Sequence, residues 1–187
     1  MSGDDPLLDA LRRVAGFLAD WTGGAAIVGG IAIVSRVRPR LTTDIDVVIT
    51  VAPDGVAALL DLAERHGWAH DPTETAELVQ GGLVRMWAPP SRAAGVGLDL
   101  LFVDSELLER VVARATLVEI AGVALPVATP EDLLVLKLEA HRPQDIDDIL
   151  AIKDAFGPTL DLAYVRAQTD LLGISDRLDL YLGDAVG

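Results

Sequence analysis

The sequence predicts an α+β fold: a mixed β-sheet flanked by helices and followed by a C-terminal helical extension. Up to residue 128, short apolar runs typical of strands alternate with amphipathic helical patterns, whereas residues 129–187 show helical patterns alone. Apolar residues make up 51% of the 187 residues and aromatic ones only 4%, so Ala, Val, Leu and Ile must build the core. We therefore expect a core domain over 1–128 and a helical subdomain over 129–187 packed on it.

Residues 1–114 contain four of the six predicted strands. The apolar runs typical of strands are residues 25–28, 43–51, 83–88 and 96–103. Helical spacing of apolar residues is found over residues 7–18, 52–66 and 105–114. Asp5-Pro6 supplies a cap and a first-turn proline for the first helix, and Gly67 ends the second. Residues 31–37 are apolar but fit either type.

A hairpin and four helices are predicted for the rest. Residues 117–120 and 123–127 flank Ala121-Gly122, which suggests a short hairpin. Thr129-Pro130-Glu131-Asp132 resembles a capping box and predicts a helix that runs to about His141. Three more helical segments follow: residues 143–156, 161–172 and 175–182.

Charge and composition exclude several functions. The net charge of −14 opposes non-specific DNA binding. Without cysteine there is no disulfide and no thiolate zinc site, so hard cations such as Mg²⁺ are the expected metals. The acidic N-terminus does not suit a secretory signal, and no apolar run reaches the roughly 18 residues of a membrane span. We expect a cytoplasmic protein with no membrane partner.

Three aspartates form the candidate metal site. Asp44 and Asp46 lie two residues apart in a strand, so both carboxylates share one face. Like charges this close repel unless a cation neutralises them, which favours a divalent metal ion. Asp99, between Leu98 and Leu100 in another predicted strand, is the candidate third ligand. The alternative is a pair of acids at a strand start that simply faces water.

The segment before Asp44 is basic. Residues 21–43 contain no acid but include Arg36, Arg38 and Arg40, which an extended chain would project to one side. Such a local reversal of charge suits an anion such as a triphosphate. The Gly29-Gly30 pair would let backbone approach phosphate oxygens. The alternative is a surface loop with unrelated arginines.

A lysine interrupts an apolar helical stripe near the C-terminal extension. Lys137 shares this stripe with leucines, so it should reach a carboxylate or a bound phosphate unless it extends to solvent at the rim of the core. Asp145 and Asp148 share a face of the next helix and could pair with Lys137 or Arg142. The alternative for these two aspartates is a solvated helix face.

These pieces together resemble a known superfamily. The chain has Gly29-Gly30-Ile31-Ala32, an Arg40-x-Thr42-x-Asp44-Ile45-Asp46 run, Leu98-Asp99-Leu100, Lys137 and Arg142-x-x-Asp145-x-x-Asp148. This combination resembles the nucleotidyltransferase superfamily of DNA polymerase β-like folds, and within it the branch of type IV toxin–antitoxin abortive-infection (AbiEii-like) nucleotidyltransferases.

The resemblance implies a reaction and assigns roles. The protein would transfer a nucleoside monophosphate from an NTP to an acceptor hydroxyl. Asp44, Asp46 and Asp99 would hold two Mg²⁺ or Mn²⁺ ions, and Asp99 could also accept the proton. The roles assigned to the other residues are phosphate binding by Gly29, Gly30 and Arg40, charge stabilisation by Lys137, bracing of the strand by Thr42, and support by Arg142, Asp145 and Asp148.

The acceptor stays open at this level. The toxin branch implies RNA, such as a tRNA end, or a protein, and a cognate antitoxin as partner, while related antibiotic-modifying enzymes imply a small aminoglycoside or lincosamide. Residues 129–187 carry twelve acids and five basic residues, which suits a cationic acceptor better than a tRNA body. A non-catalytic nucleotide- or partner-binding protein of this fold is the alternative from another functional class.

Overall fold

The structure is a computed structural model that describes residues 5–38, 42–88 and 95–183. Within these ranges it contains the mixed sheet and flanking helices of the predicted α+β fold, which is thereby confirmed. In chain order the elements are α1 (Pro6–Asp20), β1 (Ala25–Val28), α2 (Gly29–Arg36), β2 (Asp44–Ile49), α3 (Val56–Arg65), α4 (Pro72–Leu78), η1 (Val79–Gly81), β3 (Leu83–Trp87), β4 (Gly97–Phe102), α5 (Glu106–Arg114), β5 (Thr116–Ile120), β6 (Val123–Val127), α6 (Pro130–Ala140), α7 (Pro143–Phe156), η2 (Gly157–Thr159), α8 (Leu162–Leu172) and α9 (Ser175–Leu182).

The sheet places β2 near its centre. The strand order is β3-β4-β2-β1-β6-β5. β2 runs parallel to β4 and β1 runs parallel to β6, while the other neighbouring pairs are antiparallel. Because β2 has a strand on each side, its side chains are held in register with those of β1 and β4.

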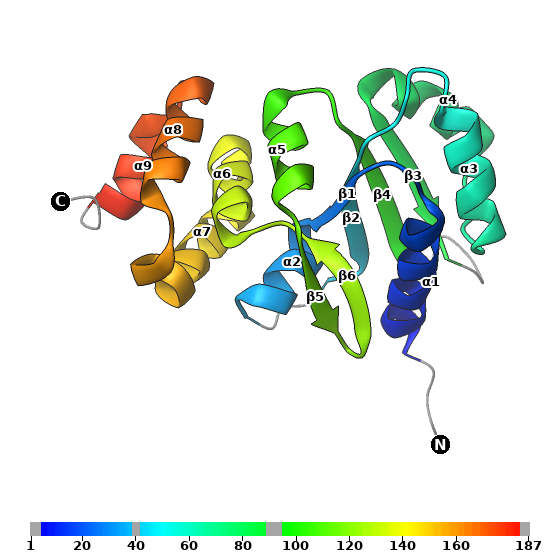
Figure 1. The fold of residues 1–187 in the computed structure, drawn as a ribbon, viewed down its shortest axis with the longest axis horizontal. Coiled ribbons are helices and arrows are strands. Elements are labelled where there is room, and N and C mark those ends of the chain that lie inside the picture. The colour runs from blue at the N-terminus through cyan, green and yellow to red at the C-terminus, as the bar shows by residue number, and fades with distance from the viewer. Residues whose placement is uncertain (1–4, 39–41, 89–94, 184–187) are drawn as a thin grey trace.

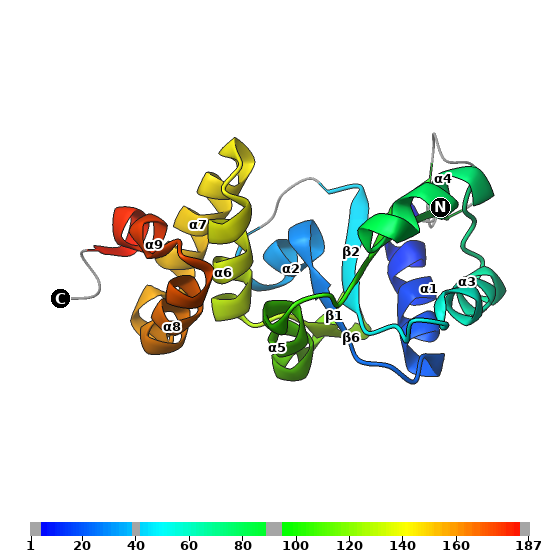
Figure 2. The same cartoon turned by 90° about the horizontal axis from the view of Figure 1, so that it is seen from above.

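Helices cover the two faces of the sheet differently. α1 and α3 lie on one side, whereas α2, α5 and the C-terminal helices lie on the other (Figures 1 and 2). Ile45, Val47 and Ile49 alternate along β2 and are fully buried. The two-residue period therefore puts the intervening Asp44 and Asp46 on the opposite face.

Local capping explains where several helices begin. Asp5, Asp71 and Thr129 each accept a backbone N–H of the helix that follows, and each precedes a proline at the first helical position. The predicted hairpin is confirmed, with Ala121 and Gly122 at φ 52° and 82°. Positive φ at both positions is what a two-residue hairpin turn needs, and Gly122 adopts it without strain.

Some boundaries and one element differ from the prediction. The ambiguous residues 31–37 fall largely in helix α2, which starts directly after β1. α3 begins at Val56 rather than residue 52, because residues 53–54 form a turn closed by Gly55 N–H to Ala52 O at 2.8 Å. Helix α4 was not predicted at all, although Asp71-Pro72 is a capping signal of the same kind as Asp5-Pro6.

The C-terminal part is helical, as predicted. In the described residues beyond β6 there are helices and no strand. α6 contacts α2 of the core and also α7 and α8, so it joins the two parts. A domain boundary at 128/129 stays a prediction. In the ranges that the structure covers, no helix is long and apolar enough to cross a membrane.

A buried carboxylate attaches the extension to the core. Asp132, at the start of α6, is fully buried and accepts hydrogen bonds from Tyr164 Oη at 2.5 Å and from Arg114 Nε at 3.1 Å. The Arg114 guanidinium also lies 3.9 Å from the centroid of the Tyr164 ring. α5, α6 and α8 therefore meet at one charge-assisted network.

We expect Tyr164→Phe to lower the free energy of unfolding by about 1–2 kcal/mol, because it removes a hydrogen bond to a buried carboxylate. Urea denaturation followed by circular dichroism measures this. Tyr181→Phe is the matched control, since its hydroxyl contacts the His141 imidazole rather than a carboxylate and should cost less. An unchanged urea midpoint for Tyr164→Phe would show that Arg114 and Thr129 suffice to satisfy Asp132.

Candidate functional site

Two neighbouring strands bring the three aspartates together. Asp46 of β2 lies directly beside Asp99 of β4, and Asp44 lies beside Gly97 in the same parallel ladder. A Cβ built on Gly97 would overlap Oδ1 of Asp44, so the absence of a side chain there leaves room for this carboxylate. The three acids predicted from sequence therefore share one face of the sheet.

The glycine pair lies against Asp46. Gly29 has φ 60°, which lets the chain turn from β1 directly into α2. A Cβ built on Gly29 would overlap Oδ2 of Asp46. The Asp46 carboxylate accepts a hydrogen bond from the backbone N–H of Gly30, in the first turn of α2. The Gly-Gly pair and the D-x-D strand thus form one structural unit.

The surroundings of Asp46 disfavour the charged form of its carboxylate. Burial raises its pKa above the ordinary value, and the neighbouring Asp99 and Asp44 carboxylates raise it further. The Gly30 N–H and the Lys137 ammonium act in the opposite direction. A cation placed among the three acids would relieve this repulsion.

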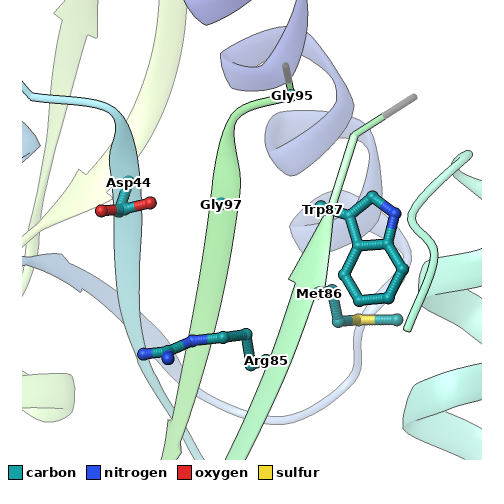
Figure 3. Close-up of a pocket in the computed structure, with 6 residues that line it drawn as sticks. All are labelled: Asp44, Arg85, Met86, Trp87, Gly95 and Gly97. Carbon is teal, nitrogen blue, oxygen red and sulfur yellow. The ribbon is translucent and has the colours of Figure 1, made fainter. Parts of the chain in front are cut away.

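A cavity of about 260 Å³ opens beside Asp44. Its lining residues come from β2, β3 and the start of β4: Asp44, Arg85, Met86, Trp87, Gly95 and Gly97 (Figure 3). A second opening, of about 230 Å³, is the Asp46 cleft, lined among others by Gly29, Asp46, Lys137 and Arg142. Asp44 thus borders one opening and Asp46 borders the other.

Arg85 is a site residue that the sequence analysis did not name. It stands opposite Asp99 in the antiparallel pairing of β3 and β4. Its Nε donates to Asp99 Oδ1 at 2.8 Å and its Nη2 donates to Oδ2 at 2.7 Å. This contact holds the pKa of Arg85 above its ordinary value. Arg85 is a single charged residue within the otherwise apolar Leu83–Trp87 strand, which could have marked it as a candidate site residue. The sequence alone does not show that its partner is Asp99.

Lys137 lies in a buried cluster with two aspartates. Its Nζ is 2.9 Å from Asp145 Oδ1 and 2.9 Å from Asp148 Oδ2, and all three residues are buried. Arg142 Nε donates to Asp145 Oδ2 at 2.7 Å. Burial alone would raise the pKa of Asp145, but the hydrogen bonds from Arg142 and Lys137 outweigh burial and hold that pKa below its ordinary value. The solvated-face alternative for the two aspartates is thereby wrong.

In the described part of the basic segment, Arg36 lies in a helix rather than in an extended chain. Arg36 ends α2 and donates to Thr116 Oγ1 at 2.6 Å and to Val127 O at 3.0 Å, so it ties α2 to the neighbouring strands. Arg38 approaches Asp148, with Nη2 at 3.6 Å from Oδ1. Arg40 lies outside the described residues. Thr42 Oγ1 donates to Asp44 O at 3.1 Å, which suits its expected bracing role.

The carboxylates suit a hard divalent cation only in part. Asp44 and Asp46 offer oxygen ligands of the kind that Mg²⁺ prefers, and Mg²⁺ commonly uses one or two carboxylates together with substrate phosphates. Both oxygens of Asp99, however, accept hydrogen bonds from Arg85. Over the residues with described positions, no group of three or more acidic or histidine side chains is arranged to hold a metal ion.

Several solved structures share the fold of this chain. The chain is similar to an antigenic nucleotidyltransferase-like protein from Paracoccidioides brasiliensis, with a TM-score of 0.53, 20% identity, and coverage of 97% of this chain and 92% of that one. A putative nucleotidyltransferase from H. pylori has a TM-score of 0.54 and 16% identity, and the match covers 100% of this chain and 83% of that one. The structure of ANT(2")-Ia in complex with adenylyl-2"-tobramycin has a TM-score of 0.51 and 15% identity, and the match covers 87% of this chain and 95% of that one. The fold is therefore nucleotidyltransferase-like.

The family follows from the sequence match. Residues 7–175 match the family described as "Nucleotidyl transferase of unknown function (DUF2204)", and the chain belongs to that family. A search of curated proteins gives no match. The nucleotidyltransferase-like family and fold expected from the motifs are thus confirmed, while the toxin–antitoxin branch stays a prediction.

We expect Gly29→Ala to destabilise the protein more than Gly82→Ala does. Both glycines have positive φ, so each variant loses about 1 kcal/mol to backbone strain. The new methyl group at Gly29 would also overlap the Asp46 carboxylate, whereas nothing lies within 4 Å of a Cβ built on Gly82. Thermal and urea unfolding compare the two, and equal losses would contradict the close approach of Asp46 to Gly29.

Asp46→Asn and Asp145→Asn should change stability in opposite directions at pH 7. The pKa of Asp46 is raised in the folded state, so its charge destabilises the fold above that pKa, and Asn removes this cost. The pKa of Asp145 is lowered, so its charge stabilises the fold above the unfolded-state pKa, and this stability is lost as pH falls through the folded-state pKa.

Urea unfolding between pH 3 and pH 7 measures both effects. Asp145→Asn is expected to cost about 3 kcal/mol at pH 7, because it breaks a buried ion pair. The gain in Asp46→Asn should shrink as pH falls through the raised folded-state pKa of Asp46 toward the unfolded-state pKa of about 4. The loss in Asp145→Asn should begin to shrink only below about 4, because the folded-state pKa of Asp145 is lowered. A stabilising Asp145→Asn or a destabilising Asp46→Asn at pH 7 would contradict the electrostatic account of the site.

Proposed function

We propose that this protein is a metal-dependent nucleotidyltransferase that moves a nucleoside monophosphate from an NTP to an acceptor hydroxyl and releases pyrophosphate. The observation that carries the proposal is the position of Asp46. Its carboxylate lies beside Asp99 in register, against Gly29 and Gly30, and within electrostatic range of Lys137. A metal-bound triphosphate is held by carboxylates that bind the metal ion, by backbone that approaches the phosphate oxygens, and by a cation that neutralises phosphate charge.

Asp44 and Asp46 are the residues that would hold Mg²⁺ or Mn²⁺ at the edge of the Asp46 cleft. A bound divalent cation supplies neutralisation of the triphosphate charge and acidifies the acceptor hydroxyl. Two carboxylates are a typical protein contribution to an Mg²⁺ site completed by substrate phosphates. A second ion of the expected pair would need Asp99 as well.

The phosphate end of the NTP would enter the Asp46 cleft. The cations near this cleft are Lys137, Arg142 and Arg38, while their buried partners are the two carboxylates Asp145 and Asp148. One net positive charge remains in this cluster, within a strongly acidic protein. Lys137 and Arg142 line the cleft directly and would stabilise charge on the leaving pyrophosphate. A phosphate role for Arg40 stays a prediction.

The transfer itself would exchange one P–O bond for another. The acceptor oxygen forms a bond to the α-phosphorus, and the bond between that phosphorus and the oxygen bridging to the β-phosphate breaks. The leaving pyrophosphate takes the bonding electron pair. Asp99 is the candidate acceptor for the hydroxyl proton at one of its carboxylate oxygens, which requires that oxygen to give up its hydrogen bond from Arg85.

The charge distribution favours a cationic acceptor. The net charge of −14 opposes an RNA body, whereas a cationic small molecule or a basic protein would be attracted. ANT(2")-Ia, whose structure contains adenylyl-2"-tobramycin, shares the fold. We therefore rank a cationic small molecule first, ahead of an RNA end, and a toxin role with a cognate antitoxin is a further candidate.

Label transfer tests the proposal. The protein is incubated with each labelled NTP, Mg²⁺, and separate pools of aminoglycosides, lincosamides, cellular protein and cellular RNA. We expect transfer to one pool, and a loss of about 100-fold or more in Asp44→Asn and Asp46→Asn. Asp61→Asn makes the same chemical change on an exposed face of α3 and should keep full activity.

Two results together would overturn the proposal: no transfer to any pool by the wild type, and equal Mg²⁺–NTP binding by the wild type and Asp44→Asn. That combination would favour a non-catalytic binding protein with the same fold.

A further inference from the structure

Arg85 donates hydrogen bonds to both carboxylate oxygens of Asp99, one of the candidate metal ligands. The Arg85 guanidinium makes two parallel hydrogen bonds to Asp99, at 2.8 and 2.7 Å, and the side chains are 45% and 17% exposed. Figure 3 shows the Arg85 side chain extending from β3 across β4 toward the strand that carries Asp44. A planar guanidinium that meets a carboxylate in this two-pronged way is among the strongest pairings available to either group.

This pairing conflicts with binding of two cations. Asp99 lies beside Asp46 in register, so a second cation between these residues would come close to the guanidinium. A cation there would meet positive charge and would have to take carboxylate lone pairs from Arg85.

We propose that Arg85 and a divalent cation compete for Asp99, so that Arg85 fills the place of the second cation in the free protein. This inference rests on the proposed function, since it assumes that Asp44 and Asp46 bind a divalent cation. In the free protein a single cation binds, at Asp44 and Asp46. A second one binds only after the guanidinium leaves Asp99.

The surroundings of Arg85 allow such a movement. The Asp44 cavity, about 260 Å³, is lined by Arg85 itself, and nearly half of the Arg85 side chain is exposed. The guanidinium can therefore leave Asp99 without crossing the core. While it stays, it reduces the net charge of the three neighbouring aspartates from −3 to −2, which stabilises the empty site.

Mn²⁺ binding to the full-length protein without nucleotide tests the proposal. Electron paramagnetic resonance and titration calorimetry count the sites that depend on Asp44, using Asp44→Asn as the blank for non-specific binding. We expect one such Mn²⁺ in the wild type and two in Arg85→Gln. Arg85→Lys keeps the charge but not the two-pronged contact, so its second site should be about tenfold weaker than that of Arg85→Gln.

Two controls locate the effect. Arg12→Gln removes the same charge from an exposed ion pair with Asp9 on α1 and should bind one Mn²⁺. Arg85→Gln/Asp99→Asn should return to one, because the gained ion needs Asp99. Circular dichroism verifies that each variant is folded. If Arg85→Gln does not fold, Arg85→Lys, which keeps the charge, is the variant that tests the competition for Asp99.

Different failures are distinguishable. Two Asp44-dependent ions in the wild type, or identical Mn²⁺ binding in the wild type and both Arg85 variants, would overturn the competition between Arg85 and the cation and leave the proposed function standing. No Asp44-dependent Mn²⁺ in any variant, even with a non-hydrolysable NTP added, would overturn the proposed function and this inference with it.

Discussion

Repulsion between carboxylates held side by side on one sheet face is the constraint on which the rest of the site depends. Asp46 and Asp99 are neighbours in the parallel ladder, and Asp44 lies two residues away on the same face. In water such charges would move apart, but a sheet fixes their backbone positions. Every group around them reduces the resulting cost: the Gly30 N–H and Lys137 at Asp46, and Arg85 at Asp99. In our proposal, the same repulsion would favour the binding of an added cation.

A second charged cluster connects the site to the helical extension. Lys137 of α6 is held between Asp145 and Asp148 of α7, and Arg38, just beyond α2, approaches Asp148. The helices that cover the site are therefore joined by buried ion pairs as well as by apolar packing. Removing one member of such a cluster leaves a charge buried without compensation. Lys137 therefore joins two helices in addition to the role in charge stabilisation that we propose for it. The effect of its substitution on activity and the effect on stability must be measured separately.

The sequence predicted most elements and several site positions, for local reasons. Alternation over Asp44–Ile49 identified a strand with two acids on one face. The apolar stripe around Lys137 predicted that this ammonium would reach a carboxylate or a bound phosphate unless it extended to solvent, and it contacts two carboxylates. The predictions that failed depended on other contacts. An extended chain would have projected Arg36 to the same side as Arg38 and Arg40, but α2 continues to Arg36 and directs it to Thr116 and Val127. Helix α4 has a capping signal but was overlooked because the residues that follow Asp71-Pro72 lack a clear apolar stripe.

By itself, the sequence determined which side chains share a face, because the periods of two in a strand and 3.6 in a helix are properties of the local backbone. It therefore determined that Asp44 and Asp46 share one face of a strand and that Asp145 and Asp148 share one face of a helix. Only the tertiary structure decided which faces meet. The register that sets Asp99 beside Asp46 and opposite Arg85, and the packing that brings Lys137 between two aspartates of the next helix, arise from contacts between separate elements. Those contacts depend on the whole core, and local patterns do not specify them.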